Sequence, residues 1–159
     1  MQTMERARMQ NPSYRLAIPM ATAETLNNGL CLLGRLLLAF VFIVEGYGKI
    51  TDYAGVQAYM AQFGVSPSLL SLVILTEFGG GLLVALGIFT RPAAFALGGF
   101  CVLAALIFHR GGGDATIGME KDFAIAGGFF VLAAHGPGVW GLGNWLLVKT
   151  RPSLRPPTK

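Results

Sequence analysis

The sequence predicts an all-α integral membrane protein, a four-helix bundle with its N- and C-termini in the cytoplasm. Of the 159 residues, 53% are hydrophobic and only 13% are charged, about half of the roughly 25% charged share usual for soluble domains. A soluble domain this small could not cover its surface with so few charges, whereas a lipid bilayer can be that surface. The apolar residues also fall into long runs near the roughly 20 residues that a membrane-spanning helix needs.

The chain divides into three parts. Residues 1–28 are polar and lack the apolar stretch of a signal peptide, so we expect a flexible N-terminal tail. Residues 29–148 contain the apolar runs and form the predicted transmembrane domain. Residues 149–159 are basic and rich in proline, which predicts a disordered C-terminal tail.

The first two spans each contain ionisable side chains. The first is expected at 29–48 and includes Arg35 and Glu45. The second is expected at 69–89, has Glu77 near its middle, and is followed by a proline that lacks the amide hydrogen a helix interior needs. Charges inside such runs are costly, so each should have a partner or face a wet cavity.

The last two spans are shorter. The third is expected at 93–109 and ends on His109. The fourth is expected at 122–135, extended by residues 119–121, before the sequence "GPG" ends it. Paired small residues in spans two to four predict closely packed helices.

The flanking charges predict the orientation. With four spans, both termini and the loop between spans two and three share one side, which carries eight Lys and Arg residues against three on the other. Because cytoplasmic flanks carry the excess of Lys and Arg, both termini are expected inside the cell.

The segment 51–64, between the first two spans, predicts a short helix lying on the outer membrane face. Asp52 is a candidate N-cap and Gly64 a candidate terminator. Its larger apolar side chains share one helical face: Tyr53, Val56, Met60 and Phe63. Beyond the fourth span, Trp140 and Trp145 are expected at the level of the lipid headgroups.

Four sequence stretches together carry a resemblance. They are "GRLLLAFVFIVEGYGKI" in span one, "TEFGGG" with the turn "FTR" in span two, "FHR" after span three, and "KDFAIAGGFF" in span four. In this combination the chain resembles the DoxX family of small bacterial inner-membrane proteins, over about residues 29–147. Glu45 departs from the family's pattern, where a small residue is more usual.

The resemblance implies a four-helix membrane protein connected with quinones. The family's namesake is a subunit of a thiosulfate–quinone oxidoreductase, and other members are linked to quinones or redox stress. Nothing in this sequence identifies a thiosulfate site, so that substrate is not carried over.

Arg35 and Glu77 are expected to form an ion pair inside the bundle. Helix rise places their charged groups within about 10 Å of one another in depth, and buried charges in membranes almost always pair. The interpretation is structural, a pair that fixes helix register, and a ligand contact at Glu77 is the alternative.

A second polar cluster is expected at the outer side. Glu45 and Lys49 have the favourable spacing and order for a helical ion pair. His109 ends span three nearby, and the same end carries Tyr47, Tyr53, Lys121 and Asp122. The cluster is a candidate site for a quinone headgroup, and a solvated rim of interface anchors is the alternative. The candidate ligand-binding residues are Arg35, Glu45, Lys49, Glu77 and His109.

The histidine positions and the motifs of the sequence limit the ligands that the chain can bind. His109 and His135 are expected at opposite ends of adjacent spans, so they cannot be the two axial ligands of one haem. No nucleotide-binding or zinc-binding motif is present, and no intrinsic cofactor or metal is expected. Basic residues do not interleave with aromatic ones, which argues against nucleic-acid binding.

The sequence therefore favours a membrane subunit of a quinone-linked redox or redox-stress system, without deciding whether it is an enzyme. Its expected partners are the lipid bilayer, a quinone, other redox subunits and a second copy of the chain. The alternatives are a non-catalytic membrane anchor or assembly factor for a soluble partner, and a small-solute permease.

Overall fold

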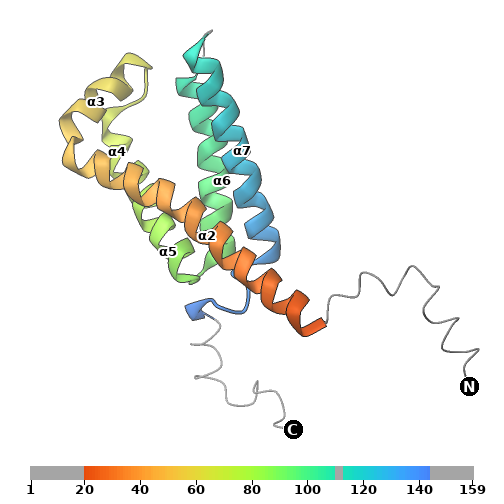
Figure 1. Cartoon of the computed structure of the whole chain (residues 1–159). Helices are drawn as coiled ribbons and strands as arrows, with labels where there is room; N and C mark the ends of the chain where they lie inside the picture. Colours follow the sequence, from red (N-terminus) through yellow and green to blue (C-terminus); the bar gives the residue numbers. More distant parts are fainter. Residues whose placement is uncertain (1–19, 110–112, 144–159) are drawn as a thin grey trace, which may run out of the picture.

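The computed structural model describes residues 20–109 and 113–143 (Figure 1). The predictions for most of the N-terminal tail, for Trp145 and for the C-terminal tail lie outside the described residues. The helices are α2 (Met20–Thr51), α3 (Tyr53–Gln62), η2 (Pro67–Leu69), α4 (Leu70–Ile74), η3 (Leu75–Gly79), α5 (Gly80–Leu86), α6 (Thr90–Phe108) and α7 (Asp114–His135). The described residues contain no strand, and the predicted fold class, an all-α membrane helical bundle, is confirmed.

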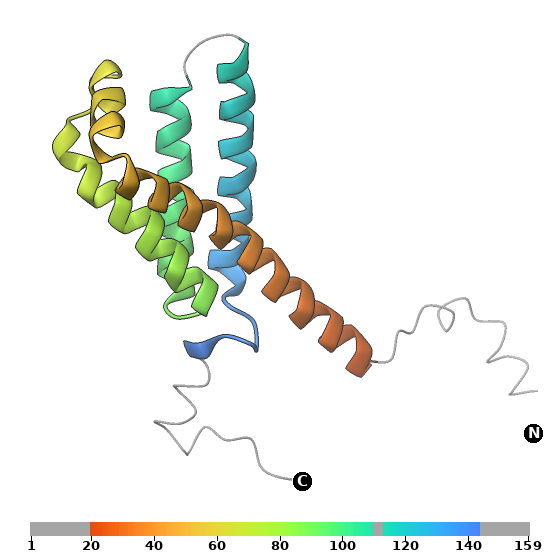
Figure 2. The same cartoon turned by 60° about the vertical axis from the view of Figure 1, so that its left-hand side comes forward.

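Three segments of the described chain are long and apolar enough to cross a membrane: Glu24–Thr51, Pro67–Leu86 and Thr90–Phe108. They correspond to the first three predicted spans. The predicted fourth span lies within α7, whose first half is polar. The helix α7 runs beside α6 along its length in both views (Figures 1 and 2). That α7 crosses the membrane as the fourth span remains a prediction.

Each predicted span begins later than the helix that contains it. The helix α2 begins at Met20 rather than at residue 29, because residues 20–28 include good helix formers and a helix can continue outside the hydrocarbon core. The helix α6 begins at Thr90 with Pro92 inside its first turn, where amide hydrogens have no helical acceptor in any case. The helix α7 begins at Asp114, so its polar residues add turns beyond the apolar run.

The helices form two pairs that share a core. The helix α2 runs antiparallel beside the second span, η2 to α5, and crosses the antiparallel hairpin of α6 and α7 obliquely (Figures 1 and 2). The core consists of small, aliphatic and aromatic side chains, with the rings of Phe42 and Phe129 in edge-to-face contact at 5.2 Å between centroids. The start of α2 and the end of α7 lie at one end of the bundle, and α3 lies at the other.

The predicted short helix between the first two spans is present as α3. Asp52 is its N-cap and accepts a hydrogen bond from the Gly55 amide, and the chain leaves the helix through Gly64 at a φ of 72°. Of the predicted apolar face, Met60 is buried against the bundle, whereas Tyr53 and Phe63 are exposed. That α3 lies on the outer membrane face remains a prediction.

The second span contains a π-helix that the sequence did not predict. The segment Leu75–Gly79 has π-helical hydrogen bonding between the α-helical segments α4 and α5, and Glu77 is its central residue. Such π-helical turns within α-helices occur frequently at functional sites.

Gly46 lets α2 approach this π-helix closely. A Cβ atom added at Gly46 would lie 2.8 Å from both the backbone nitrogen and the Cβ of Phe78. Backbone atoms cannot yield as a flexible side chain can, so only glycine fits here without a shift of one helix. The contact sets how near Glu77 comes to the last turns of α2.

We expect Gly46→Ala to destabilise the protein in detergent by about 1–2 kcal/mol, because the strain of overpacking exceeds the helix propensity that alanine gains over glycine. Gly48→Ala is the matched control, since an added Cβ at Gly48 meets nothing within 4 Å. It should leave the unfolding temperature unchanged or raise it. Equal unfolding temperatures for the two variants would show that the close approach at Gly46 does not constrain the helices.

Candidate functional site

An ion-pair network joins α2 to the π-helix. Lys49 Nζ lies 2.8 Å from Glu77 Oε2 and 3.5 Å from Glu45 Oε2. The Glu45–Lys49 pair was predicted from its helical spacing and is confirmed. The Lys49–Glu77 contact was not predicted, and it joins residues of the first two spans through one ammonium group.

Glu77 is the most deeply buried acidic residue of the described chain, with 4% of its surface exposed. Apart from the Lys49 ion pair, its Oε2 atom has no hydrogen-bond partner among the described residues. The side chains of Lys49 and Glu45 are more accessible, at 21% and 64%. The network therefore runs from an exposed carboxylate to a buried one, with Lys49 between them.

A second ion pair lies where α6 and α7 meet. Nδ1 of His109, the residue that ends α6, lies 3.1 Å from Asp122 Oδ2 on α7. The contact does not have hydrogen-bond geometry, since Nδ1 is buried without a hydrogen-bond partner. The imidazole packs so closely on Gly118 that any added side chain there would meet the ring. His109 is thus held between two turns of α7.

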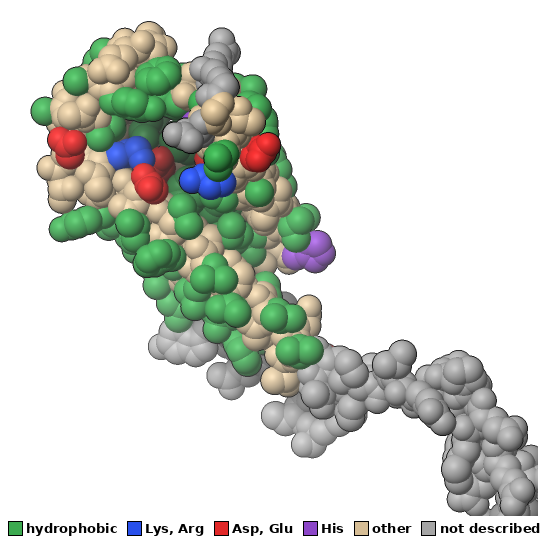
Figure 3. All heavy atoms as spheres, turned by 45° about the horizontal axis from the view of Figure 1, so that its top comes forward, with side chains coloured by type: hydrophobic (Ala, Val, Ile, Leu, Met, Phe, Trp, Pro, Cys, Tyr) green, Lys and Arg blue, Asp and Glu red, His purple; other side chains and the backbone are tan. Residues whose placement is uncertain are grey.

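The two ion pairs belong to one site, which we call the outer charged site after the membrane side that the flanking charges predict for it: Glu45, Lys49, Glu77, His109 and Asp122. The carboxylates of Glu45 and Glu77 both lie within electrostatic range of Asp122. Figure 3 views the molecule from the end that carries α3 and shows acidic and basic side chains gathered around a hollow in this face.

Aromatic rings join α3 to the end of α6 next to this site. Tyr59 stacks on Phe108 with 5.7 Å between ring centroids, and Phe63 contacts both rings. Phe108 directly precedes His109, so the aromatic cluster borders the outer charged site. Flat apolar surfaces next to charged groups suit a ligand that has an aromatic ring with polar substituents.

The predicted ion pair between Arg35 and Glu77 was wrong. Fourteen residues separate Arg35 from Lys49, a rise of about 21 Å along α2, and Glu77 contacts the Lys49 end. The depth estimate counted from the expected span ends at residues 29 and 89, whereas in the structure Gly46 of α2 lies against Phe78 and Arg35 lies against Gly87. Arg35 therefore lies near the other end of the bundle, outside the outer charged site.

Arg35 binds the segment that follows α7. Its Nη1 donates a hydrogen bond to the carbonyl oxygen of Pro137 at 2.7 Å, and its Nη2 donates to that of Trp140 at 3.1 Å. The guanidinium is buried, with 3% of the residue exposed. We call residues 136–143 the strap, because they cross the end of the bundle beneath α2 and α5.

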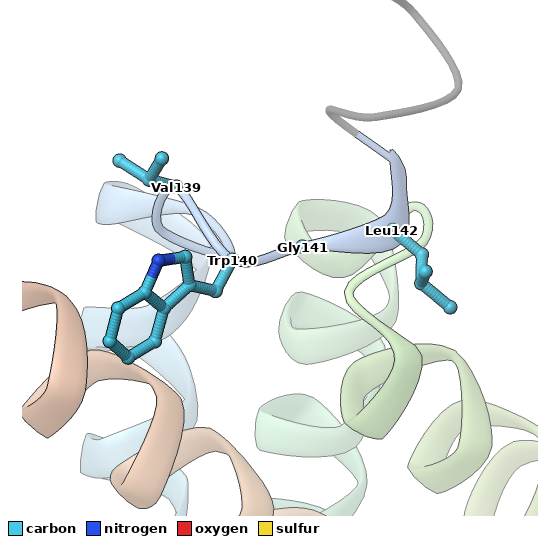
Figure 4. A pocket seen from close by; sticks show the side chains of 4 residues that line it. All are labelled: Val139, Trp140, Gly141 and Leu142. Atoms are coloured by element: carbon cyan, nitrogen blue, oxygen red, sulfur yellow. The ribbon is translucent and has the colours of Figure 1, made fainter.

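Glycines bring the strap against the bundle. The Gly143 amide donates to the Gly87 carbonyl, and an added Cβ at Gly87 would meet Arg35 Nη1 at 2.6 Å. Gly87 also has a φ of 72°, a conformation that favours glycine. Val139, Trp140, Gly141 and Leu142 line a shallow depression, in which Val139 points away from the bundle while Trp140 and Leu142 lie on its side (Figure 4). This depression has no charged lining and is no candidate for catalysis.

Four of the five predicted ligand-binding residues come together: Glu45, Lys49, Glu77 and His109. Arg35 does not join them. Tyr47 is exposed, and Tyr53 shares a hydrogen bond with Ser71 at the surface. Asp122 was predicted to belong to the polar cluster at this end, but it was not among the five candidate ligand-binding residues.

The outer charged site can exchange protons and bind a polar group, and Glu77 is its buried member. Carboxylates accept hydrogen bonds, the ammonium group donates them, and histidine can do either. The interaction between Lys49 and the buried Glu77 is strong because little water screens that carboxylate, whereas Glu45 is 64% exposed. The site can therefore hold and exchange protons.

Comparisons with known proteins give consistent results. Residues 30–110 match the family profile described as DoxX. The chain is 43% identical over 117 residues to the inner membrane protein YqjF of Escherichia coli (strain K12), covering 72% of this chain and 90% of that protein. It is 34% identical over 122 residues to the inner membrane protein YphA of the same organism, covering 71% and 87%. No solved structure matches the chain.

Proposed function

This chain belongs to the DoxX family of inner-membrane proteins, and we propose that it is a membrane subunit of a quinone-linked redox system. In this proposal a quinone headgroup binds in the outer charged site, and the isoprenoid tail lies in the bilayer beside the bundle.

One observation carries the proposal: Glu77 is a buried carboxylate on a π-helix whose Oε2 contacts only an ion-pair partner. Ionisable side chains inside membrane spans are costly and often mark substrate or proton pathways. This supports a role for Glu77 beyond holding the two helices together. The π-helix turns it toward α2, where Lys49 holds it.

The surroundings of Glu77 fit a quinone. The aromatic cluster of Tyr59, Phe63 and Phe108 offers flat surfaces for stacking. The paired His109 and Asp122 can take up or release protons, which quinone reduction consumes. The exterior of α2 is apolar along most of its length, so the tail of a quinone can lie against it.

Electrons must reach the quinone from a partner. His109 ends α6 at the outer end, and His135 ends α7 at the end that carries the strap, so the two cannot hold one haem between them. The proposal therefore assigns the quinone site to this chain and the electron donor or acceptor to another subunit.

Photolabelling tests this proposal directly. A quinone that carries an azide on its ring should, after illumination of the protein in mild detergent, attach to peptides containing residues 45–63 and 108–122, and excess unlabelled quinone should prevent the reaction. Glu77→Gln should reduce the labelling at least about 10-fold, the effect of losing one hydrogen bond to a charged group. Glu24→Gln, which neutralises an exposed carboxylate at the other end of α2, is the matched control.

Labelling that is spread over the lipid-facing helices and insensitive to Glu77→Gln would contradict the proposal. Labelling confined to the strap would place the quinone at the opposite end of the bundle and would contradict it as well.

A further inference from the structure

A single ammonium group links the buried Glu77 carboxylate to an accessible one. Lys49 Nζ lies 2.8 Å from Oε2 of Glu77 and 3.5 Å from Oε2 of Glu45. The exposed share of the side chains falls from 64% at Glu45 through 21% at Lys49 to 5% at Glu77. Charged groups therefore follow one another without a gap from the surface to the buried carboxylate. They start at the α3 end of the bundle, which is the end that carries α3.

This arrangement keeps its charges paired whether Glu77 is ionised or protonated. Ionised Glu77 has Lys49 as its partner, and a buried charge without a partner is strongly destabilising. When Glu77 takes up a proton, Lys49 still has Glu45 as its partner, so no charge is left alone. Glu77 can therefore gain and lose a proton at a lower cost than a buried carboxylate whose cation has no second partner.

The other titratable groups near Glu77 come from α6 and α7. The thiol of Cys101 and the carboxylate of Asp122 both lie within electrostatic range of Glu77. Asp122 pairs with His109, and both side chains are partly accessible. Figure 3 shows the charged side chains gathered around a hollow in this face of the molecule. The ion pair between α6 and α7 therefore opens to the same end as the pair on α2.

The core between this site and the strap end, the end that carries the strap, is apolar. The rings of Phe42 and Phe129 meet there edge to face, and both are buried. The remaining buried polar side chains of the described residues are Arg35 and Thr90. The guanidinium of Arg35 cannot release a proton in a protein, and Thr90 lies roughly 16 Å along α6 from Cys101. The described core therefore offers protons no chain of polar side chains to the strap end.

From this we infer that Glu77 exchanges protons with the aqueous phase at the α3 end and not with the phase at the strap end. A proton from that phase neutralises the Glu77 carboxylate while Lys49 stays with Glu45. Release returns the proton to the same phase and Lys49 to Glu77. The inference goes beyond the proposed function, since it holds whichever ligand the site binds. Access from one side alone also means that the chain does not carry protons across the membrane.

Carbodiimide labelling in membrane vesicles tests this one-sided access. Carbodiimides react with protonated carboxyl groups, so a membrane-permeant carbodiimide, read by mass spectrometry, reports how each carboxyl group responds to pH. Asp52 at the α3 end and Glu24 at the other end of α2 are exposed and report the pH on their own sides. The pH is clamped at different values inside and outside the vesicles, and the gradient is reversed in a second sample.

Labelling of Glu77 should rise and fall with that of Asp52 and not with that of Glu24. Lowering the pH by one unit on the Asp52 side should increase it at least about 3-fold, because each unit changes the ratio of protonated to ionised carboxyl about 10-fold. Glu45→Gln should lower the labelling of Glu77 at least about 2-fold, because Lys49 then has Glu77 alone as a partner. Glu120→Gln, which neutralises another exposed carboxylate at this end, is the matched control and should change nothing.

Labelling of Glu77 that follows Glu24, or that responds equally to both sides, would overturn the inference because the core would then pass protons. No labelling of Glu77 at any tolerated pH would overturn it as well, since Glu77 would not exchange protons. Equal labelling in Glu45→Gln and Glu120→Gln would contradict the exchange of partners by Lys49. These outcomes do not involve a quinone, so the proposed function is decided separately by the photolabelling.

Discussion

Arg35→Met should destabilise the protein in detergent by about 2–4 kcal/mol, the sum expected for two hydrogen bonds from a charged donor, reduced where water can reach the freed groups. Methionine keeps much of the length and apolar packing of the arginine stem but cannot donate. The carbonyl groups of Pro137 and Trp140 would lose their donors, and the strap would lose its main attachment to α2. The unfolding temperature in detergent measures the loss.

Two further variants separate the strap contact from charge alone. Arg35→Lys should recover part of the stability, because an ammonium can reach one of the two carbonyl groups but lacks the planar fork that binds both. Arg91→Met removes an exposed cation close to the same strap and should change the stability by less than about 0.5 kcal/mol. If Arg35→Met were as stable as the unchanged protein, the strap would not depend on Arg35.

The helical architecture could be predicted from the sequence because membrane insertion imposes it. The local signals are apolar runs of the right length, small residues at helix contacts, and the cap and terminator of α3. The apolar runs and the α3 signals each correspond to a helix in the structure. The starts of the helices were predicted too late because the prediction followed hydropathy. Hydropathy marks the hydrocarbon core, whereas hydrogen bonding and helix propensity continue α2 and α7 beyond it.

The partner of Glu77 could not be predicted in the same way. Depth counted from the expected span ends places Arg35 and Glu77 near one another, but the pairing depends on the register between α2 and the second span. Gly46 marks that register next to Glu77, and its close contact with Phe78 becomes visible only in the packed structure. The π-helix at Glu77 has no reliable sequence signal either.

Lys49→Met should be the most damaging single change at the outer charged site. It would leave Glu77 buried without its ion-pair partner, and breaking a buried pair from one side costs about 3–5 kcal/mol. Glu77→Gln should cost less, about 1–2 kcal/mol, because Lys49 remains partly exposed and keeps Glu45 as a second partner at 3.5 Å. The two losses are therefore expected to be unequal.

The central claim is that Glu77 is held by Lys49 in a site at the end of the bundle that carries α3, and not by Arg35 in a structural pair. A double-mutant cycle of Lys49→Met and Glu77→Gln, measured by unfolding in detergent, tests it most directly. The double variant should be more stable than the sum of the single losses predicts, by at least about 1.5 kcal/mol, whereas Arg35→Met and Glu77→Gln should add within about 0.5 kcal/mol. Additive losses for Lys49 and Glu77, together with coupling between Arg35 and Glu77, would contradict the claim.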